Sequence, residues 1–145
     1  MKYLLDASAL LPLITRRGKQ LIAEASRENL VTTDLAIYEA CNSLWKLATL
    51  LKTISLEDAV NVATALKDLA MRNVIQTVNF TKLDVSHTLN KAHKERLTFY
   101  DASYIATAER TEAILVTEDK KLQKAAGKFV KTITYTDLES RLAQR

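Results

Sequence analysis

The chain has 145 residues, of which 48% are hydrophobic and 26% are charged, and its formal net charge is +4. This length and balance are typical of one globular domain, which we expect to span residues 1–145. The single cysteine, Cys41, excludes an internal disulfide framework and a zinc site built on cysteines, and it fits a reducing compartment. No apolar run approaches the roughly 20 residues of a membrane span, and the first apolar run is too short for a signal peptide, so we expect a cytoplasmic protein.

The first predicted element is a buried strand over residues 3–5, because this short apolar run has no helical period. It ends at Asp6. If the strand lies at the centre of a parallel sheet, Asp6 stands at the edge where such sheets bind ligands. Pro12 and residues 16–18 (Arg-Arg-Gly) then predict a break, followed by a short helix over residues 19–27.

Residues 30–33 predict a second strand, and Asp34 or Thr33 is expected to cap a long helix over residues 35–52. The apolar face of this helix is wider than a single stripe, since it also includes Tyr38, Trp45, Leu47 and Leu50. A helix that is apolar on most sides is expected to be buried on most sides, by the fold or by a partner. We interpret Tyr38 and Trp45 as packing or interface residues rather than as platforms for base stacking.

A sequence similar to a capping box, residues 55–58 (Ser-Leu-Glu-Asp), predicts a second helix to about Arg72, which forms an antiparallel hairpin with the first. Strands are then expected over residues 74–78, 113–117 and 130–135. Helices are expected over residues 81–96, 100–111 and 119–126, and after a capping box at residues 136–139. Strands that alternate with helices predict an α/β fold of three layers, α/β/α, with a mostly parallel five-stranded sheet.

Four acidic residues lie near the ends of predicted elements, namely Asp6, Glu39, Asp101 and Asp119. Each also has an ordinary structural explanation: Asp6 as a turn residue, Asp119 as an N-cap, and Asp101 as an acidic residue in the first turn of a helix. Glu39 lies on an apolar helix and needs a partner, and Asn42 shares its face three residues later. Their positions together predict a shared site.

Carboxylates that crowd together repel one another unless a cation lies between them. Oxygen ligands without histidine or cysteine suit Mg²⁺ or Mn²⁺, and such an ion can activate a water and clamp a phosphate. The set therefore favours hydrolysis of phosphodiester bonds. We interpret His87 and His93 as surface or packing residues. Lysines and arginines that could contact phosphates, although a solvated face is their default interpretation, are Arg16, Arg17, Arg110, Lys120 and Lys121.

Four stretches in this order and spacing resemble the PIN-domain ribonucleases, especially the VapC-type toxins of prokaryotic toxin–antitoxin pairs. They are residues 5–8 (Leu-Asp-Ala-Ser), 39–42 (Glu-Ala-Cys-Asn), 100–106 (Tyr-Asp-Ala-Ser-Tyr-Ile-Ala) and 115–120 (Leu-Val-Thr-Glu-Asp-Lys). The resemblance covers nearly the whole chain. It implies a five-stranded parallel sheet between helices, an acidic site that binds Mg²⁺ or Mn²⁺ and cuts single-stranded RNA, a homodimer, and a small antitoxin that blocks the site.

By position, the acidic quartet of that family falls on Asp6, Glu39, Asp101 and Asp119, and its site hydroxyls fall on Ser8 and Thr117. These hydroxyls could orient a carboxylate or a metal-bound water, or cap a turn. Two alternatives remain within the family: a stand-alone RNA-processing nuclease, and a module that binds RNA or protein without cutting. A phosphatase or phosphoacceptor built on Asp6 is disfavoured, because such designs usually have a second aspartate where this chain has Ser8.

Overall fold

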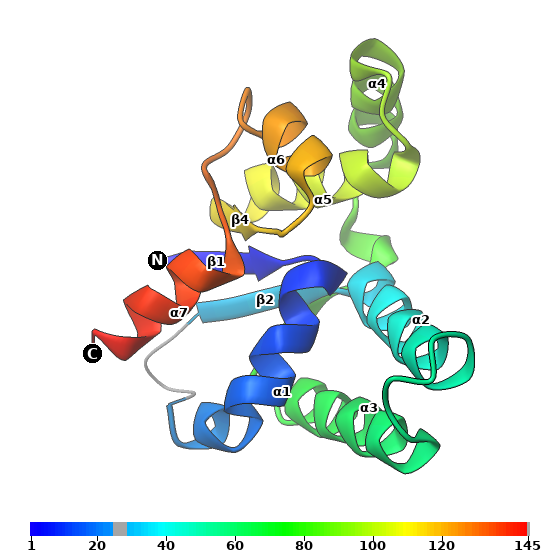
Figure 1. Ribbon diagram of the computed structural model, residues 1–145. Helices are drawn as coiled ribbons and strands as arrows, with labels where there is room; N and C mark the ends of the chain where they lie inside the picture. The colour runs from blue at the N-terminus through cyan, green and yellow to red at the C-terminus, as the bar shows by residue number, and fades with distance from the viewer. Residues whose placement is uncertain (25–28, 145) are drawn as a thin grey trace.

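The computed structural model describes residues 1–24 and 29–144 (Figure 1). Its strands form one five-stranded sheet in the order β3-β2-β1-β4-β5, and every pairing is parallel. The predicted fold class is therefore confirmed, with the first strand at the centre of the sheet. The strands are β1 (Lys2–Leu5), β2 (Asn29–Thr33), β3 (Gln76–Val78), β4 (Ala113–Val116) and β5 (Thr132–Ile133).

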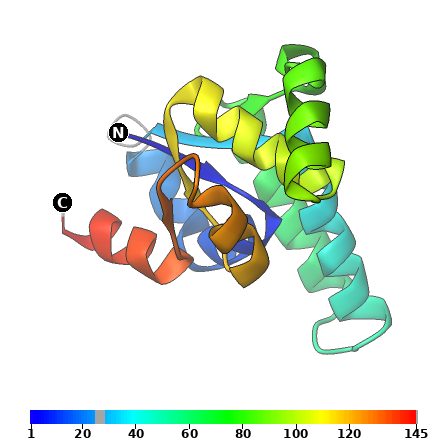
Figure 2. The same ribbon diagram turned by 90° about the horizontal axis from the view of Figure 1, so that it is seen from above.

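Helices cover both faces of this sheet. They are α1 (Ala7–Glu24), α2 (Asp34–Thr49), α3 (Leu56–Met71), α4 (Val85–Glu95), α5 (Phe99–Thr111), α6 (Lys120–Ala126) and α7 (Tyr135–Ala143), with a short 3₁₀ helix η1 (Phe80–Lys82). Helix α1 packs against α2, α3 and α7, whereas α4 packs against α5. The two views in Figures 1 and 2 agree that α4 and α5 lie apart from α1 and α7. No helix in the described ranges is both long and apolar enough to cross a membrane.

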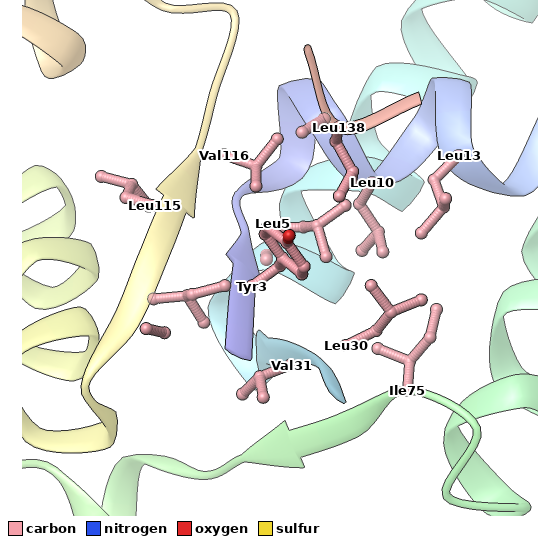
Figure 3. Close-up of a cluster of buried hydrophobic side chains, with 14 of the residues drawn as sticks. Tyr3, Leu5, Leu10, Leu13, Leu30, Val31, Ile75, Leu115, Val116 and Leu138 are labelled. Carbon is pink, nitrogen blue, oxygen red and sulfur yellow. The ribbon is translucent and has the colours of Figure 1, made fainter. Parts of the chain in front are cut away.

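The core forms where the strands meet the first helix. Successive residues of a strand point to opposite faces of the sheet, so Tyr3 and Leu5 share one face of β1. Figure 3 shows this face packed against Leu10 and Leu13 of α1, while Leu115 of β4 lies on the opposite side. Because both faces of the sheet are covered at its centre, the central strands β1 and β4 are almost continuously apolar. The sheet is thus a rigid base for the residues that follow its strands.

The predicted break after the first strand is wrong, because α1 continues through Pro12 and residues 16–18 to Glu24. The helix has one continuous buried face, made by Ala9, Leu10, Leu13, Ile14 and Leu21. Burial of this face offsets the backbone hydrogen bond that proline cannot donate. Of the helix predicted over residues 19–27, the part at 25–27 lies outside the described residues.

The fold of this chain by itself does not bury α2 on most sides, so of the two predicted alternatives burial by a partner is the one that stays a prediction. Its fully buried residues are the small Ala36 and Ala40, together with Leu44. Tyr38 and Trp45 are 79% and 52% exposed, and Leu50 just after the helix is 59% exposed. Small side chains let α2 approach its neighbours closely, so the larger apolar residues face outward. The predicted hairpin with α3 is present, since the two helices pack together.

Side-chain caps set where several helices begin. The Thr33 hydroxyl, rather than Asp34, caps α2 by accepting from the N–H of Ala36 at 3.0 Å. The last helix begins two residues earlier than predicted, because its capping box is formed by Thr134 and Asp137. The chain turns directly from β5 into α7, which aligns Tyr135, Leu138 and Leu142 with the core.

Two further boundaries differ from the sequence prediction. Helix α4 begins at Val85 with Asp84 as its cap, and the residues from Phe80 to Lys82 form η1 instead of the start of that helix. The edge strands β3 and β5 are shorter than predicted. An edge strand has a neighbour on only one side, which limits how many of its residues pair.

Candidate active site

Asp6 lies directly after β1 and anchors the beginning of α1. Its Oδ1 accepts from the Ser8 hydroxyl at 2.7 Å and from the N–H of Ala9 at 3.1 Å, and its Oδ2 accepts from the Thr117 hydroxyl at 2.5 Å. Its backbone N–H donates to the carbonyl of Val116 at 3.2 Å, which extends the pairing of β1 with β4. Asp6 is 5% exposed. The carboxylate therefore has a fixed orientation at the carboxyl edge of the two central strands.

Ser8 and Thr117 connect the residues after β1 to those after β4. Their hydroxyl oxygens lie 3.3 Å apart. The Ser8 oxygen accepts from the N–H of Glu118 at 2.9 Å, and the Thr117 oxygen accepts from the N–H of Asp119 at 3.0 Å. Both hydroxyls thus orient Asp6 and also stabilise the turn that leads to Asp119.

Asp119 caps α6, as its structural explanation requires, and it also faces the edge of the sheet. Its Oδ1 accepts from the backbone N–H groups of Lys121 and Leu122 at 2.9 and 3.2 Å. Across the described residues, no hydrogen bond involves its Oδ2. The neighbouring Glu118 points away, because its carboxylate accepts from the N–H of Tyr135 at 2.7 Å.

Glu39, on α2, is held by a residue whose role the sequence interpretation missed. The hydroxyl of Tyr104, on α5, donates to Glu39 Oε1 at 2.5 Å. Tyr104 is 3% exposed, and burial, followed by the bond to Glu39 and its charge, raises the pKa of the phenol. The only signal in the sequence is the spacing, since Tyr104 follows Asp101 by three residues and so shares its helix face.

Asp101 lies in the first turn of α5, where its backbone N–H donates to the capping hydroxyl of Thr98 at 3.1 Å. Burial raises the pKa of its carboxyl, the charges of Asp119 and Glu39 raise it further, and Lys121 opposes them. Within the part of the chain that is described, the Asp101 carboxylate forms no hydrogen bond. It is the least restrained of the four acidic side chains.

All four predicted acidic residues line one open cavity of about 590 Å³. The lining comes from the residues after β1, from α2, from α5 and from the residues after β4. It consists of Asp6, Ala7, Ser8, Leu35, Tyr38, Glu39, Asn42, Ser43, Tyr100, Asp101, Tyr104 and Asp119. In Figures 1 and 2 the arrowhead of β1 points to the side on which α2 begins. The structure thus brings together the predicted quartet, Ser8 and Asn42, while Thr117 lies behind Asp6.

The charges of the quartet act on one another across this cavity. Burial is the largest cause of the raised pKa of Asp6, the bonds from Thr117, Ser8 and Ala9 oppose it, and the charge of Asp119 adds to it. Asp119 also raises the pKa of Asp101. Repulsion between carboxylates is thus a secondary cause of these raised pKa values, after burial, and a cation bound among them would remove it.

The carboxylates are nevertheless not gathered as tightly as a loaded metal site requires. In residues 1–24 and 29–144, no group of three or more His, Cys, Asp or Glu side chains is placed so that it could hold a metal ion. The donor set itself suits Mg²⁺ or Mn²⁺, because it consists of carboxylate, hydroxyl and amide oxygens. Binding of an ion by three or more of these carboxylates would therefore require their side chains to come closer together.

The histidines and basic residues lie outside this cavity. His87 and His93 are exposed, as predicted, and His87 Nε2 lies 3.2 Å from Glu109 Oε1. Arg16 pairs with Glu139 at 3.5 Å. Of the remaining predicted phosphate contacts, Lys121 acts on the site electrostatically, because its charge lowers the pKa of Asp101.

The comparisons agree with this geometry. A model of the PIN domain matches residues 3–128. A protein named exonuclease VapC9 from Pyrobaculum aerophilum is 37% identical over 123 residues, which are 84% of each chain. A protein named ribonuclease VapC3 from the same organism is 32% identical over 139 residues, which are 92% of this chain and 99% of that one.

Solved structures share the architecture. A protein from Pyrobaculum aerophilum superimposes with a TM-score of 0.76 at 31% identity, over 100% of this chain and 98% of the other. The VapBC-1 structure from nontypeable Haemophilus influenzae gives a TM-score of 0.59 at 16% identity, over 94% of this chain and 99% of the other. At that identity the second likeness shows the fold alone.

Proposed function

This chain belongs to the PIN-domain family, and from that membership we propose that it is a divalent-metal-dependent endoribonuclease that hydrolyses phosphodiester bonds of single-stranded RNA. The observation that carries the proposal is the convergence of Asp6, Glu39, Asp101 and Asp119 on one open cavity at the carboxyl edge of the sheet. The names of the relatives, an exonuclease and a ribonuclease, support nuclease chemistry.

In this proposal, Asp6, Glu39, Asp101 and Asp119 would hold Mg²⁺ or Mn²⁺. Such an ion, when bound, would lower the pKa of a water and place positive charge beside the phosphate. Asp6 is oriented for this role by the hydroxyls of Ser8 and Thr117. Asn42 lines the same cavity and presents an amide that can bind a phosphate or a water.

Matched variants test the site. Asp6→Asn and Asp101→Asn are expected to abolish cleavage of a single-stranded oligoribonucleotide in Mg²⁺ or Mn²⁺, as EDTA should for the unaltered protein. Circular dichroism checks that both variants fold. Glu118→Gln is the control, because this carboxylate points away from the cavity and its replacement can still accept from Tyr135. Full activity of either aspartate variant would refute the proposal.

A second function within the family is a PIN module that binds RNA or protein without cutting it. The absence of a tight three-carboxylate cluster among the described residues is the observation that favours it. It predicts that the unaltered protein retains RNA but releases no product at any concentration of Mg²⁺ or Mn²⁺. The same assay therefore separates the two functions.

We also propose that the protein is a homodimer and the toxin of a pair with a small antitoxin, in the cytoplasm. The VapC names of its relatives support the toxin role. Apolar residues exposed on and after α2, including Trp45, Leu50 and Leu51, support a protein contact. Light scattering after size exclusion tests the dimer. A short reading frame for an antitoxin directly upstream would favour the toxin, and its absence would favour a stand-alone RNA-processing enzyme.

A further inference from the structure

A second cavity opens beside the acidic one and has a different character. Its volume is about 340 Å³, at the lower end of the roughly 300–1,000 Å³ of small-molecule pockets. It shares Leu35, Tyr38 and Tyr100 with the acidic cavity, so the two cavities are immediate neighbours. Adjacent groups of one bound molecule can therefore reach both.

The walls of this second cavity carry aromatic side chains from three elements. Tyr38 comes from α2, Phe80 from η1 and Tyr100 from α5, and they are 79%, 57% and 59% exposed. Phe99 is a fourth aromatic residue of the lining. Exposed aromatic faces that converge on one depression offer what an unstacked nucleobase requires, since bases of any sequence stack on them.

The side chain of Asp34 holds the Phe80 part of this aromatic wall in place. Asp34 Oδ1 accepts from the N–H of Leu35 and its Oδ2 accepts from the N–H of Phe80, both at 2.9 Å. This carboxylate joins η1 to the beginning of α2, although the two are 46 residues apart in the chain. The cavity is consequently preformed, which lowers the entropy lost when a ligand binds.

The charges of the lining select the kind of group that fits. Its described residues include one carboxylate, Asp34, and no lysine or arginine. A phosphate would gain no counter-charge there, whereas a neutral base can bury its faces. The lining also has two polar side chains that can meet the edge of a base, the exposed Asn79 and the buried Thr107.

We propose that this cavity is a base-binding subsite that holds one unstacked nucleobase of an RNA strand whose adjoining phosphate lies in the acidic cavity. The inference rests on the proposed nuclease function, and it explains why such a nuclease would act on single-stranded RNA. Bases of a duplex are stacked and paired, so only an unpaired nucleotide can place its base between Tyr38, Phe80 and Tyr100. Exposed Tyr38 thus gains a role in stacking that its sequence context did not favour.

Equilibrium binding of a fluorescein-labelled single-stranded oligoribonucleotide, measured by anisotropy in EDTA, tests the subsite without cleavage. Phe80→Leu and Tyr100→Leu are expected to weaken binding about tenfold, because each removes a stacking face. Tyr100→Phe keeps the ring and should bind within about twofold of the unaltered protein. Phe129→Leu is the control, since Phe129 is a partly exposed aromatic residue that lines neither cavity.

A second measurement locates the base. Oligonucleotides with one abasic ribose at each position in turn are titrated with the unaltered protein and with Phe80→Leu. At one position the missing base should weaken binding by the unaltered protein about tenfold, yet have little further effect on the variant. Such non-additivity arises only if that base contacts the altered wall.

Three outcomes would overturn the subsite. In the first, the abasic substitution and Phe80→Leu weaken binding additively at every position. In the second, the unaltered protein does not bind RNA. In the third, Phe80→Leu binds RNA as tightly as the unaltered protein but converts a dimer to a monomer. The last would assign the cavity to a contact between copies of the chain. The same measurements test the proposed function separately. If binding is non-additive at one position but RNA is not cleaved in Mn²⁺, the subsite is retained and the nuclease function is refuted. If RNA is cleaved but the losses are additive, the nuclease function is retained and the subsite is refuted.

Discussion

At the scale of single residues, the bond from Tyr104 to Glu39 gives the first prediction. Tyr104→Phe removes the hydroxyl that donates to Glu39 Oε1 at 2.5 Å but keeps the buried ring. The carboxylate is then free to rotate away from the cavity. We expect about tenfold weaker Mn²⁺ binding by calorimetry, since partners that orient a ligand typically contribute 10–100-fold to metal affinity.

Tyr3→Phe is the control for this substitution. Tyr3 is equally buried at 3% exposure, but it does not line the acidic cavity. Its hydroxyl lies 3.8 Å from the sulfur of Met1. It should leave Mn²⁺ affinity unchanged. If Tyr104→Phe bound Mn²⁺ as tightly as the unaltered protein, Tyr104 would have a packing role alone.

The residues of the acidic cavity show how far a sequence can predict a site. Asp6 and Asp119 could be predicted, because Asp6 directly follows one apolar strand, Asp119 comes three residues after another, and these strands, β1 and β4, are neighbours in the sheet. Glu39 stood out as a carboxylate on an apolar helix. The role of Tyr104 could not be predicted, because no local sequence pattern indicates which tyrosine will donate to a carboxylate 65 residues earlier.

At the scale of elements, the beginning of α7 gives the second prediction. Thr134→Ala removes the hydroxyl that accepts from the N–H of Asp137 at 3.2 Å. Loss of such a cap costs about 1 kcal/mol, which corresponds to a decrease of roughly 2–4 °C in melting temperature for a chain of this size. Calorimetry or thermal fluorescence measures the change.

Thr136→Ala is the matched control, because Thr136 is the cap that the sequence pattern favoured and the structure places it, exposed, inside the helix. Alanine has a higher helix propensity than threonine, so this substitution should leave the melting temperature equal or slightly higher. A larger loss for Thr136→Ala than for Thr134→Ala would mean that the helix begins where the sequence pattern put it.

The elements differ in how well the sequence specifies them. The strands β1 and β4 were predictable because their apolar runs are bounded by polar residues, and the hairpin of α2 and α3 because its connection is short. Helix α1 was not, since the conformational preferences of Pro12 and Gly18 favour a break. The burial of its continuous apolar face outweighs those preferences, and that burial exists only once the sheet has formed.

At the scale of the whole molecule, the fold concentrates negative charge in a protein whose net charge is +4. Parallel order brings Asp6 and Asp119 to one edge of the sheet, and α2 and α5 bring Glu39 and Asp101 beside them. Like charges held together by the fold cost stability when no cation is bound. Such a cost is common at functional sites, where stability is lost so that a ligand can bind.

This cost gives the third prediction, for Asp101→Asn. The raised pKa of Asp101 means that the folded protein disfavours its charged form, so its contribution to stability is greatest below the ordinary pKa of an aspartate and is lost as the pH rises through the raised value. Near pH 7 in EDTA, removing the charge should therefore raise the melting temperature by a few degrees. With Mn²⁺ the order should reverse, because a bound ion stabilises only the protein that retains its ligands. Glu118→Gln is the control and should have the melting temperature of the unaltered protein in both conditions. If Mn²⁺ raised the melting temperature of Asp101→Asn as much as that of the unaltered protein, Asp101 would be excluded from the metal site.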